Sequence, residues 1–191
     1  MEDKKGYSFE LQEDMLSLIE KEFSPQEIAD SLAAAIEGKS SPEIPEIGKR
    51  IFSEQGRRWA ARVLELGESY LDRTYEVLRE AIDTTGSPAF PLIPQRFVEI
   101  AYLSTQKIST LPIVENNMAR LIYRIGDCRT YQAISDRLGP ETAGLLVCRQ
   151  GCLNLCQGIM EGLSLEGIET EMSAKRPEQG YCQFIINNTK A

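Results

Sequence analysis

The segment GLLVCRQGCLNLCQGIMEGL, residues 144–163, constrains the fold of this chain more than any other stretch. Its cysteines recur every four residues and its glycines every seven: Cys148, Cys152 and Cys156, and Gly144, Gly151 and Gly158. Because each residue of a helix turns by about 100°, the two sets form neighbouring stripes on one helix. Glycine inside a helix costs up to about 1 kcal/mol relative to alanine. Three such costs predict that another element or a ligand lies close to this backbone.

The 191-residue chain is acidic, with a formal net charge of −8 and a pI near 4.8. This charge argues against binding to nucleic-acid backbones or anionic membrane surfaces, which require a basic face. No apolar run approaches the roughly 18 residues of a membrane span, and the N-terminus MEDKKGYSFE lacks the apolar core of a signal peptide. We therefore expect a soluble, cytoplasmic protein with neither nucleic acid nor membrane as a partner.

Histidine is absent, and the chain has five cysteines. The lack of histidine removes the usual general base and every histidine-containing triad. An odd number of cysteines in a chain without an export signal argues against a disulfide framework. Any chemistry must therefore come from the other side chains or from a bound metal or cofactor.

The hydrophobic periodicity divides the chain into a helical N-terminal region, residues 1–90, and an α+β domain, residues 91–191. In the first region, helices are predicted at 8–22, 24–37 and 47–82. In the second, helices are predicted at 95–104, 129–138 and 140–163, and strands at 107–114, 119–125, 165–174 and 181–187. From residue 107 the order is strand–strand–helix–helix–strand–strand. It predicts an antiparallel sheet with helices on one face.

The cysteines admit three interpretations from the residues alone. As metal ligands, Cys148 and Cys156 lie roughly 12 Å apart along a helix, so one zinc ion cannot bind both unless the helix breaks. In that case two neighbouring cysteines of the stripe would bind the zinc ion, and its remaining ligands would be Cys182, Cys128 or a carboxylate. Alternatively, the cysteines are ordinary small hydrophobic core residues. Thirdly, Cys128 precedes a helix, whose dipole favours a thiolate, so it is a candidate nucleophile.

Residues 107–187 resemble the 4-vinyl-reductase-type small-molecule-binding domain and its relatives. These relatives include the 2-aminothiazoline-4-carboxylate hydrolase-like proteins and trafficking-complex subunits of similar fold. The resemblance is carried by the strand IYRIGDC, the helix CRQGCLNLCQGIMEGL and the terminal hairpin ETEMSAKRPEQGYCQFII. In that hairpin a glycine is followed by a cysteine and then a phenylalanine, as in Gly180, Cys182 and Phe184.

The resemblance implies a pocket between sheet and helices, frequent homodimerisation, and in some members a zinc ion. Transferred to this chain, the zinc ligands are Cys148, Glu171 and Cys182. The family's remaining cysteine falls near Ala174, so Cys152 or Cys128 would have to replace it.

We therefore expect a protein that binds a small apolar or aromatic ligand beside Gly151 and Gly158. Candidate lining residues are aromatic: Tyr123, Phe97, Tyr102 and Trp59. A structural zinc ion at Cys148, Cys152, Cys182 and Glu171 would brace the terminal hairpin against the helix. The alternative is a hydrolase acting on a cyclic amidine-like substrate, or a tetrapyrrole-handling enzyme, with Cys128 as nucleophile or a metal-activated water. A third alternative is a scaffold subunit.

Overall fold

The computed structural model describes residues 13–69, 101–102 and 112–191. The N-terminal part is helical, with α1 (Glu13–Glu22), α2 (Pro25–Ile36) and α3 (Ile44–Ser69). The C-terminal part contains β1 (Ile113–Asn116), β2 (Arg120–Ile125), α6 (Arg129–Leu138), α7 (Pro140–Leu145), α8 (Arg149–Gly162), β3 (Ile168–Ala174), the one-turn helix α9 (Arg176–Gln179) and β4 (Cys182–Asn188). The predicted α+β class with a helical N-terminal region is confirmed.

The four strands form one antiparallel sheet in the order β1-β2-β4-β3. The last strand of the chain is therefore a central strand, paired with β2 on one side and β3 on the other. Tyr123 lies opposite Phe184, and Leu121 opposite Ile186. All four side chains are fully buried, because they occupy alternate positions that face the helices.

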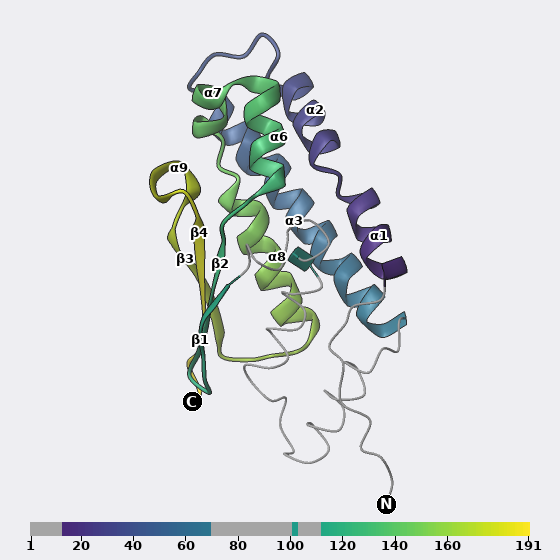
Figure 1. The fold of residues 1–191 in the computed structure, drawn as a ribbon, viewed down its shortest axis with the longest axis vertical. Coiled ribbons are helices and arrows are strands. Elements are labelled where there is room, and N and C mark those ends of the chain that lie inside the picture. Colours follow the sequence, from purple (N-terminus) through teal and green to yellow (C-terminus); the bar gives the residue numbers. More distant parts are fainter. Residues whose placement is uncertain (1–12, 70–100, 103–111) are drawn as a thin grey trace, which may run out of the picture.

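The helices lie on one side of the sheet, with α8 against it, α3 behind α8, and α1 beyond α3 (Figure 1). The main hydrophobic core draws residues from all these layers, from Ile19 in α1 to Phe184 in β4. A second core cluster lies where α2, α6, α7 and the start of α3 meet. Among the described residues, no helix combines the length and apolar character needed to cross a membrane.

Helices α2 and α3 begin close to their predicted positions, and the predicted start of α1 at residue 8 lies outside the described residues. Helix α2 begins at Pro25, although the Ser24 side chain makes no capping hydrogen bond. Helix α3 begins at Ile44, before the predicted residue 47, and the predicted extension to residue 82 lies outside the described residues. Residues 101 and 102 are helical, within the predicted helix 95–104. The predicted boundary between residues 90 and 91 also lies outside the described residues.

The predicted single helix over residues 140–163 is wrong. Leu146 is extended, with ψ of 135°, and separates α7 from α8. Its side chain is buried in the second core cluster, and a Cβ built on Gly48 of α3 would lie 2.7 Å from Leu146 Cδ2. Burial of Leu146 against α3 thus accompanies the break. As a result, Cys148 is the N-cap residue of α8 and lies outside the helical stripe.

Candidate functional site

The glycine stripe of α8 faces α3. A Cβ built on Gly56 of α3 would lie 2.2 Å from the carbonyl oxygen of Gly151, and one built on Gly158 would lie 2.6 Å from Ala60 Cβ. These separations are far shorter than a van der Waals contact, so both helices need glycine where they touch. Gly144 has no atom within 4 Å of its built Cβ. Of the two glycines predicted to bind ligand, Gly158 packs on Ala60, whereas Gly151 packs on Phe52 and also borders a cavity.

This cavity of about 50 Å³ lies where α3, α8 and the sheet meet. We call it the thiol cavity. It is lined by Phe52, Gln55, Trp59, Tyr102, Ile125, Cys128, Thr130, Tyr131, Cys148, Arg149, Gly151, Cys152, Met172, Arg176 and Cys182. Since a single water needs roughly 10–15 Å³ by the same kind of measure, the space holds only a few waters or a small chemical group.

Four of the five cysteines line the thiol cavity, and each comes from a different position in the fold. Cys128 precedes α6, Cys148 precedes α8, Cys152 lies within α8, and Cys182 begins β4. The sequence predicted that the cysteine-rich helix and the terminal hairpin share one interior, and the structure brings their thiols to the same space. Cys156 lies elsewhere in the core, where its Sγ is 3.0 Å from the hydroxyl oxygen of Tyr123.

The thiols of the cavity are uncharged at neutral pH. Burial raises the pKa of Cys148 to about 12, and burial likewise raises the pKa of Cys128, Cys152 and Cys182 above the ordinary value for a thiol. Neighbouring thiols add to this rise for Cys128, Cys148 and Cys152, because one thiolate disfavours another nearby. The cavity therefore presents S–H groups rather than thiolates.

Cys128 caps a helix and has no feature of an activated nucleophile. Its Sγ accepts a hydrogen bond from the backbone N–H of Tyr131 at 3.3 Å. That bond and the nearby Arg176 lower the pKa of the thiol, but desolvation is the larger effect and the pKa is raised overall. The thiolate is the reactive form of cysteine, so this environment disfavours nucleophilic attack at neutral pH.

The predicted metal ligands are only partly brought together. Cys148, Cys152 and Cys182 line the thiol cavity, but Glu171 is exposed and alternates with Met172, which lines the cavity from β3. Cys128 occupies the cavity wall instead. Within the described ranges, no group of three or more His, Cys, Asp or Glu is arranged to hold a metal ion. The sulfurs are thus the right donor type for zinc, but they are not arranged as a zinc site.

The predicted aromatic lining residues have different positions. Tyr102 and Trp59 line the thiol cavity, with ring centroids 5.6 Å apart. Tyr123 is fully buried in the core, stacked on Phe184 at 5.3 Å, and is absent from the cavity wall. Phe97 lies outside the described residues.

The polar lining of the cavity was not predicted from the sequence. Arg149 and Arg176 reach its wall, and no Asp or Glu from the described part of the chain does. The buried Trp59 Nε1 has no hydrogen-bond partner in the described structure. A buried N–H without a partner costs about 1–3 kcal/mol. The only sequence feature that pointed to Arg149 is its position directly after Cys148 in the segment 144–163.

A second pocket of about 230 Å³ adjoins the thiol cavity, and we call it the outer pocket. The two share four lining residues: Cys148, Arg149, Met172 and Cys182. The remaining wall of the outer pocket comes from the α7–α8 connection and from the α9 turn, where Lys175 pairs with Glu178 at 2.6 Å. A molecule in the outer pocket therefore lies next to the thiols.

Comparison of the chain with family models, curated proteins and solved structures finds no match to any of them.

Proposed function

We propose that this cytoplasmic protein binds a small, largely apolar molecule in the thiol cavity and the adjoining outer pocket. One observation carries this proposal: four thiols from separated segments converge on one cavity between sheet and helices. Phe52, Ile125 and Met172 supply the carbon and thioether walls beside them. Binding sites of this kind are mostly apolar, with a few polar groups that orient the ligand.

Ligand binding is tested by thermal unfolding of the full chain with phenol, indole and short-chain alcohols as probes. A ligand at a hundredfold excess over its Kd stabilises the native state by about 2.7 kcal/mol, which raises the unfolding temperature. Cys182→Leu places extra carbon in the wall shared by the two pockets and is expected to remove the shift. Gln183→Leu, on the opposite face of the same strand, is the control and should keep it. Equal shifts in both variants would place binding elsewhere.

Zinc remains a proposal with a revised ligand set. Because Glu171 faces away from the cavity, we propose Cys128 in its place, together with Cys148, Cys152 and Cys182. A zinc ion would have to draw these sulfurs together and displace their protons, since zinc binds the thiolate. The expectation is one zinc per chain in protein purified without added metal, lost on chelation together with thermal stability. Metal-free protein with intact cysteines would refute it.

Hydrolysis and homodimerisation stay predictions. For hydrolysis, Cys128 is a poor candidate nucleophile at neutral pH, because burial raises the pKa of its thiol and the thiolate is the reactive form. Ligand binding is therefore the function that the cavity supports best.

A further inference from the structure

We propose that the ligand is an aliphatic molecule with one polar end, whose carbon chain fills the thiol cavity while the polar end stays in the outer pocket. This inference rests on the proposed ligand-binding function and names the chemical class and the orientation of the ligand. The size of the inner chamber and the change of polarity between the two chambers support it. Because the chambers share four lining residues, one molecule can occupy both.

The thiol cavity is too small for an aromatic ring. Its volume is about 50 Å³. An apolar protein cavity that binds benzene measures about 150 Å³, three times as much. Since a water-sized group takes roughly 10–15 Å³ by this kind of measure, the thiol cavity holds about four carbon atoms. The end of a short aliphatic chain fits this space, and a ring has to remain outside it.

The thiol cavity offers almost nothing to a polar group. The surface that its wall exposes is almost wholly carbon and sulfur, and thiols and thioethers are weak hydrogen-bond partners. Arg176 reaches the wall, but its guanidinium donates to the carbonyl oxygen of Gly126 and lies over the ring of Tyr131. A polar group in this space would give up its hydrogen bonds to water without replacing them, which is unfavourable. The carbon end of the ligand therefore lies inside.

The outer pocket suits the polar end. It is larger, at about 230 Å³, and its wall exposes polar and carbon atoms in comparable amounts. Its charged side chains are Arg149, Lys175 and Glu178, and all three are exposed to water. Lys175 and Glu178 pair with each other at 2.6 Å. A polar group here keeps hydrogen-bond partners from the protein or from water, so its burial costs little.

The test titrates the full chain with the straight-chain alcohols from 1-propanol to 1-octanol. Binding is followed by the fluorescence of Trp59, which is the only tryptophan and lines the thiol cavity. Affinity is expected to rise about fourfold for each added methylene while the chain end enters the cavity. The gain is expected to fall once the cavity is full, beyond about four or five carbons. An undiminished rise up to 1-octanol would overturn the inference.

Two further compounds test shape and orientation. Benzyl alcohol carries a ring in place of the chain, and 1,5-pentanediol has to place one hydroxyl among carbon and sulfur. Each is expected to bind about tenfold more weakly than 1-pentanol, because the ring does not fit and the inner hydroxyl has no strong hydrogen-bond partner. Benzyl alcohol or the diol binding as tightly as 1-pentanol would contradict the proposed class or orientation.

A matched pair of variants locates the chain. Ile125 lines the thiol cavity, whereas Ile134 lies in the second core cluster outside it, and both are buried. Replacement of either by valine removes one methyl group and is mild enough to keep the protein folded. In Ile125→Val the chain length at which the gain falls should increase by about one carbon, because the cavity is larger. Ile134→Val should keep the natural profile. The same profile in both variants would place the chain elsewhere.

The outcomes separate this inference from ligand binding itself. If phenol or indole raises the unfolding temperature and the alcohols show no dependence on chain length, ligand binding stands and the aliphatic class is refuted. Silence from phenol, indole and every alcohol would refute both.

Discussion

At the scale of single residues, Gly56 and Gly151 set the distance between α3 and α8. A Cβ built on Gly56 would meet the backbone of Gly151, which cannot rotate away as a side chain could. Gly56→Ala must therefore push the helices apart, at a cost of roughly 1–3 kcal/mol for an overpacked core. Gly144→Ala has free space around the new methyl and should be neutral or stabilising by up to about 1 kcal/mol. Urea unfolding of both variants measures the difference, and equal effects would contradict the close approach.

The buried thiols make stability fall in alkaline solution. The pKa of Cys148 rises from 9.0 to about 12 on folding because of burial, so the folded state keeps a proton that the unfolded chain loses first. The contribution of the Cys148 thiol to the free energy of unfolding is therefore fully present below pH 9 and is lost as pH rises toward 12. Between pH 9 and 11, Cys148→Ala should therefore lose less stability than the natural chain, by up to about 1.4 kcal/mol per pH unit. Urea unfolding at several pH values measures the slopes. Val147→Ala is the control and should keep the natural slope; identical slopes in all three proteins would show that Cys148 ionises freely.

Single residues differ in how well the sequence predicts their surroundings. The spacing of the glycines in α8 indicated that something lies close to the backbone of this helix. The spacing could not show whether that neighbour is another helix or a ligand, because either one requires that a side chain be absent. The prediction that Cys182 lies near Cys148 and Cys152 came from the resemblance of the terminal hairpin, whereas the residues alone left Cys182, Cys128 and a carboxylate as alternatives. The positions of Arg149 and Arg176 depend on the break after α7 and on the α9 turn, and neither follows from periodicity.

At the scale of elements, α6 depends on its first residue. Cys128 accepts the hydrogen bond of the Tyr131 N–H that would otherwise lack a partner. Cys128→Ala should cost about 1 kcal/mol, as for other lost helix caps, whereas Cys128→Ser should restore most of it because a hydroxyl oxygen accepts this bond as well. Urea unfolding of both variants measures the effect. Equal destabilisation by Ala and Ser would instead show that the sulfur matters for packing in the cavity.

The break between α7 and α8 shows the limit of reading elements from local pattern. Residues 140–163 carry helical periodicity throughout, and no proline follows Pro140 within them to interrupt it. The interruption at Leu146 coincides with burial of that side chain in the second core cluster, against α3. Such a tertiary contact overrides local propensity and cannot be seen in a window of neighbouring residues. By contrast, α6, β2 and β4 follow the predicted spans to within one residue at each end.

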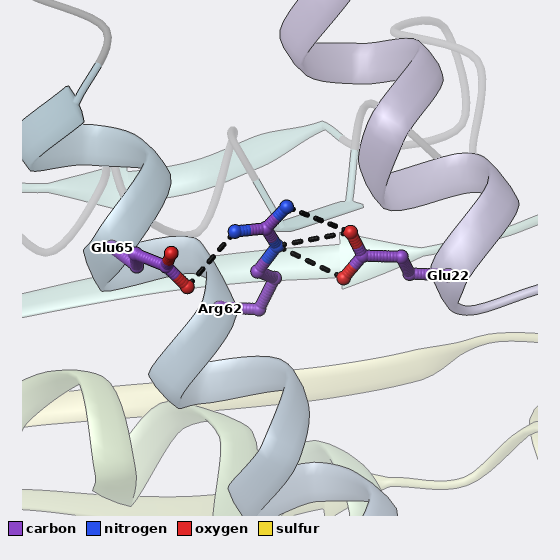
Figure 2. A network of polar contacts seen from close by, with 3 residues as sticks. All are labelled: Glu22, Arg62 and Glu65. Carbon is purple, nitrogen blue, oxygen red and sulfur yellow. Dashed lines mark hydrogen bonds and ion pairs between the residues drawn. The ribbon is translucent and has the colours of Figure 1, made fainter.

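At the scale of the whole molecule, a chain of aromatic rings joins the N-terminal helices to the sheet. Neighbouring members are stacked, tilted or edge-to-face at centroid distances of 5.3–5.8 Å: Phe23, Trp59, Tyr102, Tyr123 and Phe184. At the outer layer, Arg62 of α3 binds both carboxylate oxygens of Glu22 of α1, and its third nitrogen pairs with Glu65 at 2.9 Å (Figure 2). Helices α1 and α3 thus share the core of the sheet.

This shared core predicts that residues 91–191 do not fold alone. Without α1 and α3, the isolated fragment would lose much of the cover over Tyr123, Phe184 and their neighbours. Each large side chain returned to water costs about 1.5–3 kcal/mol, so a few of them equal the usual total stability of 5–15 kcal/mol. We expect the fragment to show no cooperative thermal transition, and co-expression with residues 1–90 to restore one. A cooperative transition in the fragment alone would mean that the sheet and α8 form an independent domain, and that the aromatic chain stabilises only the docking of the N-terminal helices.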